Sequence, residues 1–98
     1  MKVELTEQVV TFVRSQAPAP RQKLRLGLRR LALEHGDIRA LEGPLQGYHR
    51  LRVGSHRIVF TYAKRGARRT AIHCLFAERR DTVYTVFSRM LERDVLWQ

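Results

Sequence analysis

The spacing of hydrophobic residues in the first third of the chain is typical of amphipathic helices, after a short opening strand over residues 1–5. Thr6 is suited to cap a helix, and the following positions at helical spacing are Val9, Phe12, Val13 and Gln16. The stretch APAP, residues 17–20, ends this helix, because proline can neither donate a backbone hydrogen bond nor continue the turn.

Pro20 fits the first turn of a second helix, and Gly36 is well placed to end it. This helix has one apolar and one basic stripe, formed by Leu24, Leu28 and Leu31 and by Arg21, Arg25 and Arg29. The two helices are therefore predicted to form an αα-hairpin. The arginine stripe is either a solvated face or a surface that binds a partner.

After Gly36 the hydrophobic period changes to two, which is typical of strands. A loop punctuated by Gly43, Pro44 and Gly47 leads into a strand over residues 48–53. Gly54 and Ser55 make a tight turn into a strand over 56–62, and a second turn over 63–69 precedes a strand over 70–77. A last amphipathic helix is indicated by Val86, Phe87, Met90, Leu91 and Val95.

The predicted fold class is α+β, in a single domain over residues 1–98. An N-terminal helical hairpin packs on a small, mainly antiparallel twisted sheet, and a C-terminal helix follows. Alternation gives the sheet a buried face with Leu51, Val53, Ile58 and Phe60. The opposite face gathers Arg50, Arg52 and Arg57. Because like charges across a strand pair are destabilising, this second face is predicted to bind an anion such as a nucleic-acid backbone.

Net charge strengthens this prediction. Lysine and arginine number 19 against 9 acidic residues, giving a formal charge of +10, and 16 of the 19 are arginine. The planar fork of arginine binds phosphate at two points and stays charged at any working pH. Nucleic acid or a strongly acidic protein is therefore the implied partner, the alternative being a basic surface without a specific anion.

Several classes of protein do not fit the composition. A hydrophobic fraction of 44% is that of a globular chain, and no apolar run reaches the roughly 18 to 20 residues of a membrane span. The N-terminus lacks the pattern of a signal peptide, so a cytoplasmic location is expected. Cys74 is the only cysteine, and neither zinc-ligand spacing nor a glycine-rich phosphate loop occurs, so no cofactor and no metal is predicted.

Two stretches carry a resemblance to a known family. LEGPLQGYHRLRVGSHRIVFTY, residues 41–62, followed by AERRDTVY, residues 77–84, resembles the RelE/ParE superfamily of toxins from bacterial toxin–antitoxin pairs. The resemblance covers residues 3–92 and implies the RelE-like microbial RNase fold, with a strand, two helices, three further strands and a last helix. It also implies a cognate antitoxin as partner. RelE-type members cut messenger RNA in the ribosomal A site, whereas ParE-type members poison DNA gyrase without nuclease chemistry.

The resemblance to RelE-type members implies residue roles. Arg57 matches the hairpin arginine, Arg79 or its neighbour Arg80 matches an arginine after the last strand, and Tyr84 matches a C-terminal tyrosine. Arg50 aligns with one of two strand lysines of that family, and Tyr48 or Arg52 aligns with the other. The predicted catalytic residues are therefore Arg57, Arg79, Tyr84 and Arg50, and the predicted nucleic-acid-binding residues are Arg52, Tyr48 and Arg80.

Replacement of lysine by arginine at these positions matters for proton transfer. Cleavage without a metal needs a base for the ribose 2′-OH, cations for the phosphorane and an acid for the 5′-oxygen. Arginine cannot be the base. Tyr84 could serve if close arginines help it to lose its proton, unless it only packs in the last helix. The remaining candidates are the histidines His49, His56 and His73. Alternation turns His49 and His56 toward the other face.

Together these features predict a toxin that is a ribosome-dependent, metal-independent endoribonuclease. The alternatives are a ParE-type gyrase inhibitor and a relative that binds nucleic acid without cutting it. The nuclease is favoured because only its chemistry requires the arginines and Tyr84 to cluster on one face.

Overall fold

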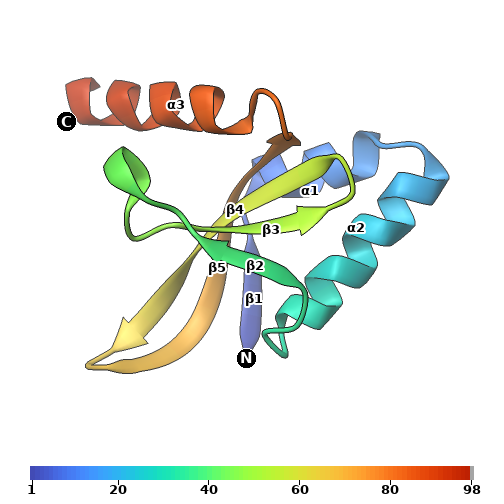
Figure 1. Cartoon of the computed structure of the whole chain (residues 1–98), viewed down its shortest axis with the longest axis horizontal. Coiled ribbons are helices and arrows are strands. Elements are labelled where there is room, and N and C mark those ends of the chain that lie inside the picture. Colours follow the sequence, from blue (N-terminus) through green and yellow to red (C-terminus); the bar gives the residue numbers. More distant parts are fainter. Residues whose placement is uncertain (98) are drawn as a thin grey trace.

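The computed structural model describes residues 1–97, and the side chains of residues 1–93. Figure 1 shows the elements in chain order: strand β1 (Lys2–Leu5), helix α1 (Glu7–Ser15), helix α2 (Pro18–Leu31), strand β2 (Asp37–Ala40), the 3-10 turn η1 (Gly43–Leu45), strands β3 (His49–Val53), β4 (His56–Arg65) and β5 (Arg68–Arg79), and helix α3 (Val83–Trp97). Within residues 1–97, no helix is long and apolar enough to cross a membrane.

The strands form one sheet in the order β1-β5-β4-β3-β2. β1 pairs with β5 in parallel, and the other neighbours pair antiparallel. This mixed but mainly antiparallel sheet, with a helical hairpin before it and a helix after it, is the α+β fold class predicted from the sequence.

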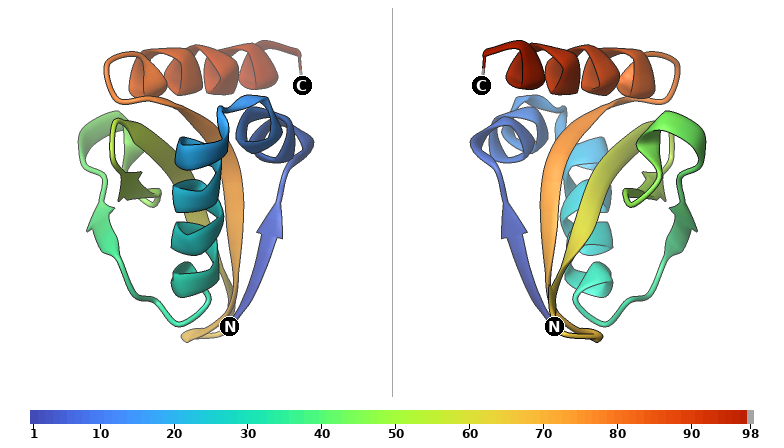
Figure 2. Two further views of the ribbon diagram at one scale, coloured as in Figure 1. Left: turned by 90° about the vertical axis from the view of Figure 1, so that its right-hand side faces the viewer. Right: turned by 90° about the vertical axis from the view of Figure 1, so that its left-hand side faces the viewer.

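Helices cover both faces of the sheet, and each face has its own hydrophobic cluster. On one face α1 and α2 pack through Val9 and Leu24 onto strand residues that include Leu51 and Phe60. On the other face α3 packs through Phe87 onto a smaller cluster made with Val59, Phe76 and Val83. Figure 2 shows α2 lying along the sheet while α3 crosses its upper end. The face with α3 is the one predicted to carry the arginines.

The N-terminal hairpin begins as its sequence predicts. The Thr6 side chain accepts a hydrogen bond from the Val9 N–H, which caps α1. α2 begins at Pro18, where a missing N–H costs nothing. Farther along α2, Gly27 lies against β3, and an added Cβ there would come within 2.8 Å of Val53 Cγ2. The small residue therefore lets the helix approach the sheet closely.

The end of α2 differs from the prediction, because the helix stops at Leu31 and not at Gly36. The N–H of Glu34 donates to the Leu31 carbonyl at 2.8 Å, and the N–H of His35 donates to the Arg30 carbonyl at 3.0 Å. This pair of bonds closes the helix through a residue in the left-handed region, which is Glu34 with φ of 55°. Glycine usually occupies that position, so the sequence pattern pointed to the wrong residue.

Two strand predictions were also wrong in extent. β2 lies inside the stretch predicted as a loop, so the sheet has one more strand than the resemblance implies. β4 and β5 continue through most of the predicted turn over 63–69 and reverse at residues 66–67. These strand ends extend beyond the core, where backbone pairing continues without the apolar alternation that marks a buried strand.

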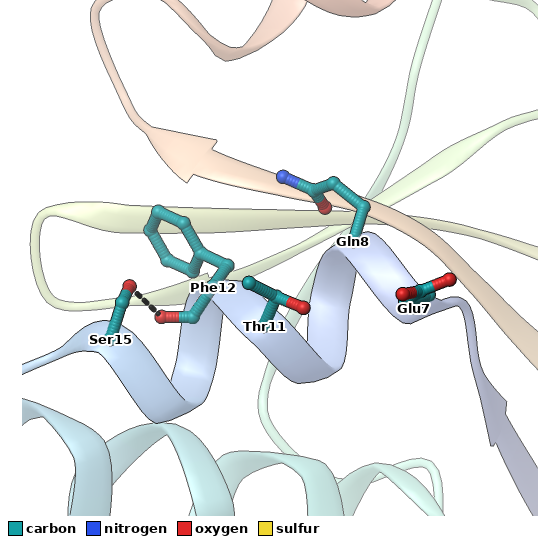
Figure 3. Close-up of a pocket in the computed structure, with 5 residues that line it drawn as sticks. All are labelled: Glu7, Gln8, Thr11, Phe12 and Ser15. Atoms are coloured by element: carbon teal, nitrogen blue, oxygen red, sulfur yellow. Dashed lines mark hydrogen bonds between the residues drawn. The ribbon is translucent and has the colours of Figure 1, made fainter.

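A glutamine side chain extends the sheet where β1 ends. Gln8 donates to the Ala77 carbonyl and accepts from the Ala77 N–H, both at 2.8 Å. Figure 3 shows this side chain pointing from α1 toward β5. Ala77 is fully buried, so its backbone groups have no access to water.

We expect Gln8→Ala to lower the free energy of unfolding by about 1–3 kcal/mol, because it leaves two buried backbone groups of Ala77 without partners. Urea denaturation followed by circular dichroism measures this loss. Gln22→Ala removes an exposed glutamine from α2 and is the matched control. Equal stabilities of the two variants would contradict the proposed role of Gln8.

Candidate functional site

The hairpin of β3 and β4 places two predicted site residues directly opposite each other. Arg52 and Arg57 are cross-strand partners, joined through a tight turn in which Gly54 has φ of +60°. The Arg57 Nη1 donates to the carbonyls of Gly54 and His56, each at 2.9 Å. These two bonds hold the guanidinium over the turn, although an arginine faces it across the strands.

Arg50 lies on the same face but is buried, with 8% of its surface exposed. Its Nη1 donates to a carboxylate oxygen of Asp37 at 3.1 Å and to the Asp37 carbonyl at 3.0 Å. Arg52 lies 3.9 Å from the second carboxylate oxygen. The hydrogen bond from Arg50 is the main reason why the pKa of Asp37 is lowered. The charge of Arg50 is therefore already balanced inside the protein.

The lowered pKa of Asp37 gives a pH-dependent prediction. A carboxylate with a depressed folded-state pKa stabilises the fold above its ordinary value of 3.8, and this stabilisation is lost as pH falls through the folded-state pKa. Asp37→Asn should therefore lower the melting temperature at pH 7, with a difference from wild type that disappears below pH 3.8. Thermal melts between pH 2 and 7 measure it, and Glu42→Gln is the control for an exposed carboxylate. A constant difference down to pH 2 would mean that the ion pair is not its cause.

Arg79 and Arg80 follow at the end of β5. The Arg80 N–H donates to the Ser55 carbonyl at 2.9 Å, which fastens this segment to the hairpin turn. A hollow of about 420 Å³, here called the arginine hollow, lies between them and is lined by Arg52, Gly54, Ser55, Arg79, Arg80 and Asp81. The segment after the last strand thus meets the hairpin, as the predicted site requires.

The charges of Arg79 and Arg80 act on different neighbouring side chains. Burial lowers the pKa of the Arg57 guanidinium, and the charges of Arg52 and Arg50 lower it further. Arg80 also lowers it, whereas Tyr84 acts in the opposite direction. Arg79 instead is the cross-strand partner of His56, and its charge helps burial to lower the pKa of that histidine. Arg80 is therefore the one of the two whose charge acts on Arg57.

The two predicted tyrosines belong to the cluster under α3. Tyr84 is half-buried in the first turn of α3 and packs against this cluster. Tyr48 is half-buried and packs edge-to-face on Phe87, with ring centroids 5.1 Å apart. The ring of Tyr48 is thus engaged in packing. The charge of Tyr84 acts on the Arg57 guanidinium.

The histidines lie away from this group. His56 packs edge-to-face on Phe12 of α1, and His49 stacks on Phe60, so both lie on the face of the helical hairpin. His73 shares the arginine face, but its Nε2 lies 3.1 Å from a Glu4 carboxylate oxygen. It pairs with Thr61, four residues along β4 from Arg57, or about 13 Å. Of the predicted bases, Tyr84 is the one that packs in the cluster under α3, on the arginine face.

Two residues that sequence reasoning missed shape the site. Asp37 neutralises Arg50 from a strand that was predicted as loop. Glu78 is the cross-strand partner of Arg57, and its carboxylate accepts the Arg79 N–H at 3.0 Å. Had β5 been predicted at its full length, pairing it with β4 would have placed Glu78 opposite Arg57.

Other chemistry is not supported by the described residues. Among them, no three histidine, cysteine, aspartate or glutamate side chains are grouped to hold a metal ion. Burial raises the pKa of the Cys74 thiol to about 12, so this thiol stays protonated and unreactive. A hollow of about 490 Å³ on the outer side of α1 is lined by Glu7, Gln8, Thr11, Phe12 and Ser15, and its charged group is a carboxylate (Figure 3). It does not suit an anionic ligand.

Comparisons with known proteins show which solved structures share this fold. No protein-family model matches the sequence, and no curated protein matches it. Solved structures do match. The YoeB/ParE toxin from Agrobacterium tumefaciens is 18% identical with a TM-score of 0.64, covering 82% of this chain and 99% of that one. The toxin–antitoxin complex RelBE2 from Mycobacterium tuberculosis is 18% identical with a TM-score of 0.62, covering 81% and 96%.

A third match is the RelB–RelE antitoxin–toxin complex from Methanococcus jannaschii, 19% identical with a TM-score of 0.61, covering 86% of this chain and 98% of that one. The three structures match between 81% and 86% of this chain with TM-scores of 0.61 to 0.64. The chain therefore has the fold of the RelE/ParE superfamily of toxins, as the hairpin motif predicted.

Proposed function

We propose that this protein is the toxin of a type II toxin–antitoxin pair and an endoribonuclease that cuts messenger RNA in the ribosomal A site. The observation that carries the proposal is that Arg52, Arg57 and Tyr84 lie on the face of the sheet under α3, with the Arg80 segment bonded to the turn between β3 and β4, on a fold shared with RelE. Such a group provides positive charge where the phosphorane develops charge, together with a hydroxyl that can exchange protons.

The reaction runs without a metal. The Tyr84 oxygen takes the proton of the ribose 2′-OH as its own proton passes to solvent, and the resulting alkoxide attacks the adjacent phosphorus. Arg57 and Arg80 stabilise the pentacoordinate phosphorane. The bond to the 5′-oxygen then breaks, that oxygen gains a proton from solvent, and a 2′,3′-cyclic phosphate remains. Arg50, held by Asp37, orders the strand below Arg52 and does not face the RNA.

The geometry of Tyr84 gives a direct test of this assignment. Tyr84→Phe keeps the ring and its packing but deletes the hydroxyl, so the single-turnover cleavage rate should fall by about 10² or more while the melting temperature barely changes. Tyr48→Phe is the control, because Tyr48 packs in the same cluster. If Tyr84→Phe cleaves at the wild-type rate, Tyr84 serves in packing only and another group is the base.

The proposed antitoxin binds the same cations. Two of the structural relatives are complexes of a toxin with its antitoxin. We expect an acidic segment of the antitoxin to contact the arginine hollow or to displace α3, because the first change neutralises cations of the proposed site and the second removes Tyr84 from it. A complex in which the antitoxin touches neither would indicate another mode of inhibition.

A second candidate function is inhibition of DNA gyrase, as in ParE-type toxins. One observation favours it: the Asp37 carboxylate withdraws Arg50 from the surface, which leaves fewer cations for phosphate chemistry. Incubation of the purified protein with ribosome-bound message, with free message and with gyrase separates the two. Cleavage of the ribosome-bound message alone supports the nuclease, whereas loss of supercoiling with intact message supports the gyrase inhibitor.

A further inference from the structure

Three hollows meet at the turn between β3 and β4. The arginine hollow shares Gly54 and Ser55 with a small pocket of about 140 Å³ beside α2, which is lined in addition by Lys23 and His56. That pocket shares Lys23 and Val53 with a groove of about 310 Å³ between α2 and β3. This third hollow, here called the α2–β3 groove, also contains Arg52, which it shares with the arginine hollow. Each hollow thus shares lining residues with the next around the turn.

Cations line both walls of the α2–β3 groove. Lys23 and Arg30 project from α2, and Arg52 lies on β3. Both α2 side chains are exposed, and neither forms an ion pair with a side chain among residues 1–93. The carboxylate in the groove is Asp37, which Arg50 and Arg52 already neutralise. The groove therefore carries unbalanced positive charge.

The floor of the groove is apolar. It is formed mainly by Val53 of β3, above the almost fully buried Leu51, and by Gly27, whose missing side chain brings the backbone of α2 close to the sheet. Leu26 lies at the rim with 41% of its surface exposed. Lys23 and Arg30 are seven residues apart on α2, or about 10 Å along the helix axis. Cationic walls above an apolar floor suit a chain with a phosphate backbone and flat bases.

We propose that the α2–β3 groove binds the nucleotides of a single-stranded RNA that flank the phosphodiester held at Arg57. Lys23 and Arg30 contact phosphates, and the apolar floor contacts a sugar or base. The identity of the strand as message rests on the proposed function, whereas the binding of single-stranded RNA to this groove does not.

Binding of fluorescent single-stranded oligonucleotides of 3 to 12 residues tests the groove, with 2′-O-methyl riboses that prevent cleavage. Anisotropy titrations should show wild-type affinity rising with length. For the double variant Lys23→Ala and Arg30→Ala, the loss at 0.1 M salt should be roughly 10- to 30-fold for the 12-mer. The salt slope should fall by about 1.4, because each phosphate contact in a single strand contributes about 0.7. The 3-mer, held in the arginine hollow, should bind both proteins equally.

The matched control is Arg25→Ala with Arg29→Ala, which removes two exposed charges from the same helix outside the groove. Its affinity for the 12-mer should stay within about threefold of wild type. Equal losses in the two double variants would overturn the groove as the site, and so would an unchanged 12-mer affinity after Lys23→Ala and Arg30→Ala. A protein that shows the length dependence but never cuts message would lose the proposed function and keep the groove.

Discussion

Arg57→Ala is expected to lower the rate of message cleavage by about 10² or more. The reason is electrostatic: Arg57 provides charge beside the phosphorane, in a half-buried position where charge acts more strongly than in water. Single-turnover cleavage of ribosome-bound message measures the rate, and a thermal melt shows whether the turn at Gly54 has kept its structure.

Arg68→Ala is the matched control for Arg57→Ala. Arg68 is an exposed strand arginine at the far end of the sheet, so its removal lowers the net charge by the same amount without touching the site. If both variants lose the same modest factor, the cations act only through the overall charge of the protein, and Arg57 has no specific part in the reaction.

Phe87→Ala is expected to have the largest effect on stability among changes near the site. Phe87 is fully buried between α3 and the sheet, where its ring contacts Tyr48 and Phe76. Truncation of a buried phenylalanine costs about 3–5 kcal/mol, and each kcal/mol corresponds to roughly 4–8 °C in a domain of this size. Because α3 also carries Tyr84, cleavage should fall together with the melting temperature.

Val86→Ala is the neighbouring control in α3, because Val86 is 39% exposed. It should shift the melting temperature by much less than Phe87→Ala does. Hydrogen exchange then separates undocking of α3 from unfolding of the whole domain as the cause of lost activity. Faster exchange in α3 alone means that the helix undocks from an intact sheet. If Phe87→Ala and Val86→Ala melt together, the cluster under α3 does not hold the helix.

The hairpin was predictable because strand alternation has a strict period of two. Once the turn at Gly54 and Ser55 is recognised, parity places Arg50, Arg52 and Arg57 on one face, and the cross-strand register confirms it. The same rule correctly turned His49 and His56 toward the helical hairpin. Local sequence therefore sufficed for the direction of each side chain in this part of the sheet.

Burial of individual side chains was not predictable in the same way. Arg50 was expected in an open cleft, but its burial depends on Asp37 of β2, a four-residue edge strand, DIRA, that is too short to stand out as a strand in the sequence. Tyr48 was expected to contact nucleic acid, but Phe87 of α3 lies against it. Both environments come from residues distant in the chain. The side chain of Val95, predicted on the apolar side of α3, lies outside the described residues.

The most direct measurement is the chemistry of the new RNA ends when the purified protein acts on message held in the ribosomal A site, in the presence of EDTA. We expect cuts within the A-site codon that leave a 2′,3′-cyclic phosphate, none on free message, and none with Arg57→Ala. Intact message on stalled or running ribosomes, together with inhibition of gyrase supercoiling by the same preparation, would contradict the nuclease assignment and establish the gyrase inhibitor in its place.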